Sequence, residues 1–486
     1  MADRKSGTRT ARLALFACAL AFLLSVAAYV PSVNSETAPS ALPIKHIVII
    51  VEENHTFDNY FGTYPGANGI NGSVKEPVAP GEPATVSPFH IPGVNVSSDL
   101  CHTWTCAHDA YDGGKLDGFI SSQGGSNLTM GYFDYHQIPY YWDYASQFVL
   151  LDNFYSSVMA ASLPNHLYLV AGQSGGLTGD SKNGRINFTS SLVSNSTFFF
   201  PSIANELSAN SITWKYYAGG YNYLNNWNPM PAFASIVNSP AMTNDLAPPS
   251  SFASDIKAGK LPSVSWLMPA EDSESEHPPY NVSVGEHMVV SAINTVMQSA
   301  YWNSTAIFVT FDDYGGWYDH VPPPQVDGFG YGFRVPCLVI SPYARQGMID
   351  HVQGDFTSIL KFVETVFSLH PLSTRDAAAS NMMEAFDFAQ APRAPLVLPG
   401  IYVPDHYPLQ LAPGQTGTGS TTSSETSVIG GGVPSGSNNS PNQAASIYLP
   451  AAVVTIAFVF LSAAAASSAR RTERRKMELA PQDQEG

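Results

Sequence analysis

Two short runs of apolar residues, 46–51 and 306–311, each end abruptly in a group of acidic or amide side chains. Both runs are rich in β-forming residues and have the length of a strand buried on both faces of a sheet. The polar residues that follow are Glu52, Glu53 and Asn54 after the first run, and Asp312 and Asp313 after the second. Open α/β sheets bind ligands at the carboxyl ends of their strands, so we expect the two groups to form one cation site.

The rest of the pattern alternates between strand-like runs and helix-like segments. Further strands are predicted at 147–155, 211–217, 263–268 and 333–341, and helices at 284–299, at 355–367 and just after Ser162. This alternation, with strands that read as continuous apolar runs, predicts a three-layer α/β sandwich around a central, mostly parallel sheet.

A cluster of aromatic residues at 133–144, FDYHQIPYYWDY, has two interpretations. The first is packing at the surface of the folded domain. The second is a rim that binds an apolar or sugar-bearing substrate. The sequence pattern leaves both open.

The two ends of the chain have compositions unlike the middle. Residues 13–30 form an apolar run after a basic start, which is typical of a secretory signal or of a retained N-terminal anchor. Near the other end, a stretch of Gly, Ser, Thr and Asn cannot bury enough apolar surface to order itself. The expected organisation is a signal or anchor at 1–35, a folded body at 36–411, a stalk at 412–446, a transmembrane helix at 447–466 and a basic tail at 467–486.

The largely apolar segment 447–466 is long enough to cross a bilayer. Basic residues follow it at once: Arg470, Arg471, Arg474, Arg475 and Lys476. Because basic residues favour the cytoplasmic side, the segment predicts a single-pass protein of the cell membrane whose folded body lies outside.

Charge narrows the range of partners. The chain has 39 acidic and 22 basic residues, for a net charge of −17. Several of the basic residues flank the apolar segments near the two ends of the chain, so the folded body is more acidic than the net charge of the whole chain suggests. No basic patch suited to a polyanion is visible, and the sequence argues against nucleic acid as a partner.

For Cys101 and Cys106 the sequence allows two states, a disulfide bond or a zinc site. In an exported protein a local disulfide is the default, whereas the sequence CHTWTCAH also offers a zinc site if His102 and His108 join the two thiols. Cys337 lies inside the strand-like run PCLVIS and is expected to be a buried structural thiol.

The chain also carries nine Asn-X-Ser/Thr acceptor patterns, which suit a glycosylated exterior. They begin at Asn54, Asn71, Asn95, Asn127, Asn187, Asn195, Asn281, Asn303 and Asn438. Asn54 is the exception, because its place at the predicted cation site implies that it is buried and unmodified.

The predicted cation site suggests phosphoryl-transfer chemistry. Oxygen donors suit Ca²⁺, Mg²⁺ or Mn²⁺, and the histidines nearby keep Zn²⁺ or Fe open. A serine at a helix start gains from the helix dipole and from free N–H groups, so Ser162 is either a simple N-cap or a nucleophile. A cation beside it would lower the pKa of its hydroxyl and polarise a phosphoryl oxygen.

Three blocks of the sequence carry a resemblance to a known family. ENHTFDNYFG, SLPNHLYLVAG and TFDDYGGWYDHVPPP resemble, in the right order, the blocks of the bacterial phospholipase C and acid phosphatase family of phosphoesterases. The resemblance covers roughly residues 43–370 and implies an alkaline-phosphatase-like α/β fold. It also implies a divalent metal ion and a phosphate-ester substrate.

Carried over position by position, the resemblance assigns roles to nine residues. The metal ligands fall on Glu53, Asn54, Asp312 and Asp313, the nucleophile on Ser162, and the site histidines on His102 and His277. Asn165 and His320 also match motif positions and are expected to take part in catalysis.

The chain departs from the family pattern at two positions. His55 and His166 stand where many phospholipase members have Arg. The replacement removes two permanent charges and favours a site that works with protonated histidines.

Three functions remain open. The membrane segment and the aromatic cluster favour phospholipase C-type cleavage of phospholipids, to which we lean. The histidine replacements favour an acid phosphatase that acts on small phosphomonoesters. A surface glycoprotein that keeps the fold and binds without cleaving is the alternative of another class.

Overall fold

The computed structural model describes residues 42–182, 185–186, 198–221 and 224–400. The predicted signal, stalk, transmembrane helix and basic tail lie outside the described residues. Among the helices of the described part, none combines the length and the apolar character that crossing a bilayer requires.

An eight-stranded sheet lies at the centre of the described part, in the order β11-β10-β12-β1-β13-β14-β6-β15. Its strands are β1 (His46–Glu52), β6 (Val149–Leu151), β10 (Trp214–Tyr217), β11 (Leu246–Ala247), β12 (Val264–Leu267), β13 (Thr305–Phe311), β14 (Cys337–Ile340) and β15 (Met348–Asp350). All neighbours are parallel except the pairs that β14 makes with β13 and β6. The predicted α/β fold with a mostly parallel sheet is therefore confirmed.

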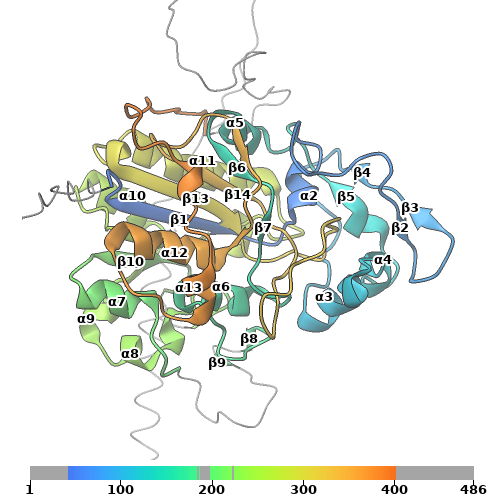
Figure 1. Ribbon diagram of the computed structural model, residues 1–486, viewed down its shortest axis with the longest axis horizontal. Coiled ribbons are helices and arrows are strands. Elements are labelled where there is room, and N and C mark those ends of the chain that lie inside the picture. Colours follow the sequence, from blue (N-terminus) through green and yellow to red (C-terminus); the bar gives the residue numbers. More distant parts are fainter. Residues whose placement is uncertain (1–41, 183–184, 187–197, 222–223, 401–486) are drawn as a thin grey trace, which may run out of the picture. The chain divides into compact units, whose positions relative to one another are not determined.

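Helices cover both faces of the sheet, as Figure 1 shows. On one face lie α5 (Pro139–Gln147), α10 (Ser251–Lys257) and α11 (Val282–Met297); on the other lie α6 (Ser162–Ala171), α7 (Ile203–Ala209) and α12 (Phe356–Phe367). The apolar face of α12 meets the sheet where Phe362 packs edge-on against Phe308 of β13. This arrangement gives the three layers that the alternation of elements predicts.

Smaller elements surround the sheet. The remaining α-helices of the described part are α2 (Phe57–Phe61), α3 (Trp104–Tyr111), α4 (Phe119–Ser122), α8 (Ala234–Val237), α9 (Pro240–Thr243) and α13 (Thr374–Ala378). Two-residue strands pair outside the main sheet as β2 (Glu76–Pro77) with β3 (Thr85–Val86), β4 (Phe89–His90) with β5 (Gly131–Tyr132), β7 (Phe154–Tyr155) with β16 (Gly354–Asp355), and β8 (Ser181–Lys182) with β9 (Arg185–Ile186).

The structure corrects one sequence-based expectation, that 333–341 is the last strand, and decides between the two interpretations of the aromatic cluster. The segment 333–341 is not the last strand, because β15 follows it and pairs with β6. The aromatic cluster at 133–144 forms no substrate rim, since Phe133, Tyr140, Tyr141 and Tyr144 are all fully buried. The aromatic cluster therefore serves packing. Cys337 is buried in β14 as a free thiol, as expected.

Candidate active site

The carboxyl ends of β1 and β13 bring the two predicted acidic groups together. The strands are adjacent and parallel, with Glu52 opposite Phe311, so Glu53 and Asp312 both leave the sheet at the same edge. The backbone N–H of Asp312 donates to the Glu52 carbonyl oxygen at 3.1 Å, which extends the pairing by one residue.

Asn54 turns the chain at this edge. Its φ of 66° lies in the left-handed region, which asparagine tolerates better than most residues. Its backbone N–H donates to Asp312 Oδ1 at 3.1 Å. Gly315, on the other strand's loop, packs against this turn so closely that a Cβ there would lie 2.1 Å from the Asn54 carbonyl oxygen.

The carboxylates of this edge are buried and incompletely paired. Glu53, Asp312 and Asp313 are each at most 1% exposed, and one oxygen of each has no hydrogen-bond partner among the described residues. Burial raises the pKa of Glu53 well above its ordinary value, and the neighbouring charges of Asp312 and Asp313 raise it further. Burial and the charge of Asp312 raise the pKa of Asp313 in the same way.

These residues fit a divalent cation. Buried carboxylate oxygens without partners cost free energy that a cation between them recovers. The Asn54 amide lies against two of these carboxylates. With its side-chain oxygen on that side, the oxygen is 3.1 Å from Asp312 Oδ1 and 3.3 Å from Asp313 Oδ1. Three oxygens that face one another are either bridged by a cation or relieved by reversing the amide, which then donates to both carboxylates.

Ser162 approaches the same carboxylates from the first turn of α6. Its Oγ donates to Glu53 Oε2 at 3.2 Å, and its side chain is 3% exposed. Because it is the first residue of the helix, it lies at the positive end of the helix dipole, which favours a bound anion.

His102 and His277 complete one side of the site. The Nδ1 of His102 donates to the Leu100 carbonyl oxygen at 2.8 Å, and that of His277 donates to the Pro278 carbonyl oxygen at 2.6 Å. Both rings therefore turn Nε2 toward the Asn54 amide, at 3.4 Å for His102 and 2.8 Å for His277.

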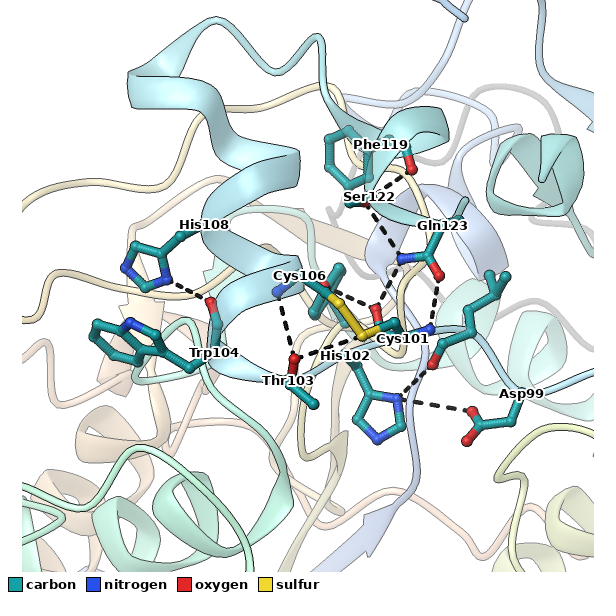
Figure 2. The surroundings of a disulfide bond; sticks show 12 residues. Asp99, Cys101, His102, Thr103, Trp104, Cys106, His108, Phe119, Ser122 and Gln123 are labelled. Atoms are coloured by element: carbon teal, nitrogen blue, oxygen red, sulfur yellow. Dashed lines mark hydrogen bonds and ion pairs between the residues drawn. A yellow bond between two sulfur atoms is a disulfide. The ribbon is translucent and has the colours of Figure 1, made fainter. Parts of the chain in front are cut away.

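A disulfide stabilises the loop that carries His102. Figure 2 shows the bond between Cys101 and Cys106, with His102 between them in the sequence and Asp99 beside its ring. Gln123 holds Cys101 by two hydrogen bonds, donating to its carbonyl oxygen at 2.8 Å and accepting from its N–H at 2.7 Å. The disulfide is confirmed, and the alternative zinc site is wrong because its two thiols are joined to each other.

A pocket of about 690 Å³ opens over these groups. Glu53, Ser162, His102 and His277 line one part of it. The rest of the lining comes from Asp180, Gly219, Gly220, Leu224, Asn225, Asn226, Trp227, Ala270, Glu271, Asp272, Ser273 and Tyr280. None of these described lining residues is Lys or Arg, so an anionic phosphate finds its positive charge here in a cation, a protonated histidine or the helix N-terminus.

Two predicted residues lie elsewhere. Asn165 binds backbone only: its Oδ1 accepts from the Val158 N–H at 3.1 Å, and its Nδ2 donates to carbonyl oxygens of the same loop. His320 contacts Asp58 at 2.6 Å and Asn68 at 3.3 Å, in a buried cluster around Arg334. The structure thus brings together seven of the nine residues assigned from the family blocks.

Two residues in the site carry no role in the sequence-based assignment. Asp180 lines the pocket and accepts from the Leu163 N–H at 2.9 Å, at the start of α6. His166 is fully buried, with Nε2 3.6 Å from Glu53 Oε1. Asp180 stands in a glycine-rich loop without a motif, whereas the four-residue spacing from Ser162 on one helix was a usable signal for His166.

The two histidines that replace Arg do not supply a charge. Burial lowers the pKa of both His55 and His166 to about 4. The His55 ring lies between Asn59 and the Glu276 carbonyl oxygen, at 2.6 and 2.9 Å, and it does not line the pocket. These two residues therefore do not support a site that works through protonated histidines at mildly acidic pH.

The chain is similar in sequence to several known phospholipases C. The phospholipase C A of Mycobacterium tuberculosis is 30% identical over 411 residues, covering 72% of this chain and 78% of that protein. The hemolytic phospholipase C of Pseudomonas aeruginosa is 27% identical and covers 72% and 56%. The non-specific phospholipase C1 of Arabidopsis thaliana is 28% identical and covers 72% of each.

Similarity to solved structures is weaker. A member of the alkaline phosphatase superfamily from Vibrio parahaemolyticus has a TM-score of 0.32 at 14% identity, covering 68% of this chain and 71% of that one. The model of the Phosphoesterase family matches residues 44–370, which include all nine assigned residues. The chain therefore belongs to the phosphoesterase family, a family of enzymes that hydrolyse phosphoric esters.

Proposed function

We propose that this enzyme cleaves phosphate esters through Ser162 with the help of a divalent cation, and that its substrates are phospholipids. The observation that carries the proposal is the position of Ser162. Its hydroxyl lies at a helix N-terminus and donates a hydrogen bond to Glu53, in a pocket that His102 and His277 also line. The phospholipid substrate is supported by the curated relatives, which bear the name phospholipase C.

The cation would be held by Glu53, Asn54, Asp312 and Asp313. Such a cation supplies neutralisation of phosphoryl oxygens and a lower pKa for a hydroxyl beside it. Glu53 holds the Ser162 hydroxyl in place, and the α6 N-terminus orients an anionic phosphate toward it.

The reaction has two steps. Ser162 Oγ attacks phosphorus and passes its proton to Glu53, which already accepts a hydrogen bond from it. The Oγ–P bond forms and the bond to the diacylglycerol oxygen breaks, while a protonated His102 or His277 gives its Nε2 proton to the leaving alkoxide. Water then attacks phosphorus and gives a proton to the histidine that is now neutral. The Oγ–P bond breaks, and Ser162 leaves as a hydroxyl with the proton that Glu53 returns. The headgroup phosphate is released.

The test uses the Ser162→Ala variant and an acid quench of wild-type enzyme during turnover. Wild type is expected to show phosphate attached to Ser162 by mass spectrometry, and the variant is expected to lose both this adduct and turnover. The control is Ser146→Ala, because Ser146 lies on α5 and its hydroxyl donates only to the Asp143 carbonyl oxygen, at 2.8 Å. Unchanged hydrolysis by Ser162→Ala would contradict the proposed nucleophile.

A substrate panel separates the alternatives. Release of diacylglycerol from phosphatidylcholine vesicles, without hydrolysis of p-nitrophenyl phosphate, is the expected result. The reverse would identify an acid phosphatase. No hydrolysis of either by metal-loaded protein would favour a surface protein that only binds.

The proposed place of action is the outer face of the cell membrane. The support comes from the sequence, where the apolar segment 447–466 is followed by a cluster of basic residues. Fractionation of cells that express the full chain should place it in the membrane, and truncation after residue 446 should release it. Recovery of the full chain in the soluble fraction would contradict this location.

A further inference from the structure

His166 and Ser162 reach the same carboxylate from one helix. They stand four residues apart on α6, so their side chains lie on the same face, one turn apart. Ser162 Oγ donates to Glu53 Oε2 at 3.2 Å, and His166 Nε2 lies 3.6 Å from Glu53 Oε1. Each oxygen of Glu53 is thus faced by one of the two side chains.

His166 lacks any other partner. Its side chain is 0% exposed, and neither ring nitrogen makes a hydrogen bond within the described residues. A buried polar group without a partner costs roughly 1–3 kcal/mol, so such a ring persists in a folded protein where something binds it. Glu53 Oε1, which His166 Nε2 faces, is also without a hydrogen-bond partner, and so is Oδ2 of Asp312.

These three side chains form a triangle. One ligand atom from each of Glu53, His166 and Asp312 lies within 4.8 Å of the other two, and all three residues are buried. Atoms bound to a single metal at about 2.0–2.2 Å are necessarily this close to one another. The triangle therefore has the size and the donor atoms of a cation site.

We propose that His166 is a direct nitrogen ligand of the cation that Glu53 and Asp312 bind. This inference rests on the metal-assisted chemistry proposed above and narrows it. A carboxylate and imidazole set suits Zn²⁺, Mn²⁺ or Fe²⁺, whereas an all-oxygen set suits Ca²⁺ or Mg²⁺. The site is thus expected to bind Zn²⁺, Mn²⁺ or Fe²⁺ in preference to Ca²⁺ or Mg²⁺.

The experiment measures metal binding without turnover. Purified full-length protein is stripped with a chelator, and Co²⁺ and Zn²⁺ are titrated into wild type and His166→Gln, with the Co²⁺ visible spectrum recorded. The Zn²⁺ affinity of the variant is expected to fall by at least about 100-fold, because loss of outer-shell partners alone costs about 10–100-fold. Its Mg²⁺ affinity is expected to change less than threefold.

Two further variants serve as controls. His320→Gln changes a histidine that contacts Asp58 in the other buried cluster, and it should leave Zn²⁺ affinity unchanged. His166→Asp puts an oxygen ligand in place of the nitrogen and should recover Mn²⁺ binding while the Co²⁺ spectrum stays altered. If His166→Gln does not fold, pulsed electron spin resonance of Mn²⁺-loaded His102→Gln/His277→Gln protein decides, since a nitrogen coupling must then come from His166.

The outcomes separate the inference from the proposed function. Equal Zn²⁺ affinity and equal Co²⁺ spectra in wild type and His166→Gln overturn the His166 assignment and leave metal-assisted hydrolysis standing. Absence of any nitrogen coupling in the double variant overturns it as well. Failure of the wild type to bind any divalent ion overturns the metal-assisted mechanism itself.

Discussion

Two clusters of acidic side chains are buried in this protein, one around Arg334 and one at the carboxyl ends of β1 and β13. They differ in how their negative charge is balanced. In the cluster around Arg334, the guanidinium donates to both oxygens of Asp319, at 2.8 and 3.0 Å, and to Asp58 Oδ1 at 3.0 Å. His320 binds the second oxygen of Asp58. In the active-site cluster, Glu53, Asp312 and Asp313 each keep one oxygen without a partner.

The difference shows where each cluster obtains its positive charge. The first holds a cation that is part of the chain, so its geometry is complete on folding. The second has no Lys or Arg among the described residues that line its pocket, which leaves a bound cation or a protonated histidine as the source of its positive charge. A complete cluster stabilises the fold, whereas an incomplete one keeps positions open for a ligand and a substrate.

The largest expected effect comes from removing one open carboxylate. Asp312→Asn keeps an oxygen that accepts from the Asn54 and Asp313 N–H groups, but it loses the charge that binds a cation. We expect hydrolysis to fall by about 10³-fold, equivalent to roughly 4 kcal/mol. Steady-state kinetics at saturating metal measures it, and near wild-type rates would contradict the shared site.

The next largest effect concerns the completed cluster. Arg334→Met leaves Asp58 and Asp319 buried without their cation, and we expect it to lower the free energy of unfolding by about 3–5 kcal/mol. Chemical denaturation measures this loss. His320→Gln serves as the milder control, because partly exposed groups such as the His320 ring at the edge of such a cluster contribute less to stability. A stable Arg334→Met protein would remove the contrast between the clusters.

Removing the metal should sharpen the comparison. A ligand at 100 to 1,000 times its Kd stabilises a protein by about 2.7–4.1 kcal/mol, so chelation should lower the melting temperature of wild type. Asp312→Asn should melt at the same temperature with and without chelator. Scanning calorimetry of both proteins tests this, and a wild-type melting temperature that ignores chelator would count against a bound cation.

Glu76 is a buried carboxylate whose negative charge is removed in a third way, by binding a proton. Its carboxylate is 1% exposed and accepts from the Phe119 N–H at 2.9 Å; burial raises its pKa from 4.5 to about 8. The stability that follows from this raised pKa is fully present below pH 4.5 and is lost as pH rises to about 8.

Glu76→Gln cannot ionise and keeps an oxygen for Phe119. The stability of the variant relative to wild type should therefore increase between pH 5 and pH 8. Urea unfolding at both pH values measures the difference. An equal difference at the two pH values would contradict the raised pKa.

The meeting of the two acidic groups could be predicted from the sequence because it depends on where two strands end. Glu53 and Asp312 each follow a buried run, and adjacent parallel strands leave little choice about where such residues meet. The direction of β14 was beyond reach, since a short apolar run looks the same in a parallel or an antiparallel pair. The burial of the aromatic residues at 133–144 equally depends on what packs against them.

Two of the nine motif positions lie away from the site. Asn165 and His320 both stand within family blocks, yet one binds a backbone loop and the other binds Asp58. The family comparison identified His166 only as a position where Arg is replaced. Its four-residue spacing from Ser162 places it on the same face of α6. Asp180 reaches the site through a loop whose path the sequence does not reveal.

The turn at Asn54 has a consequence for producing this enzyme. Asn54, His55 and Thr56 form an acceptor pattern for N-linked glycans, and the folded protein buries the Asn54 amide completely. Glycan transfer in a eukaryotic secretory pathway takes place while the chain is still unfolded, so it competes with burial. A sugar attached there would block assembly of the cluster, and hosts that lack this modification should yield a larger active fraction per molecule of purified protein.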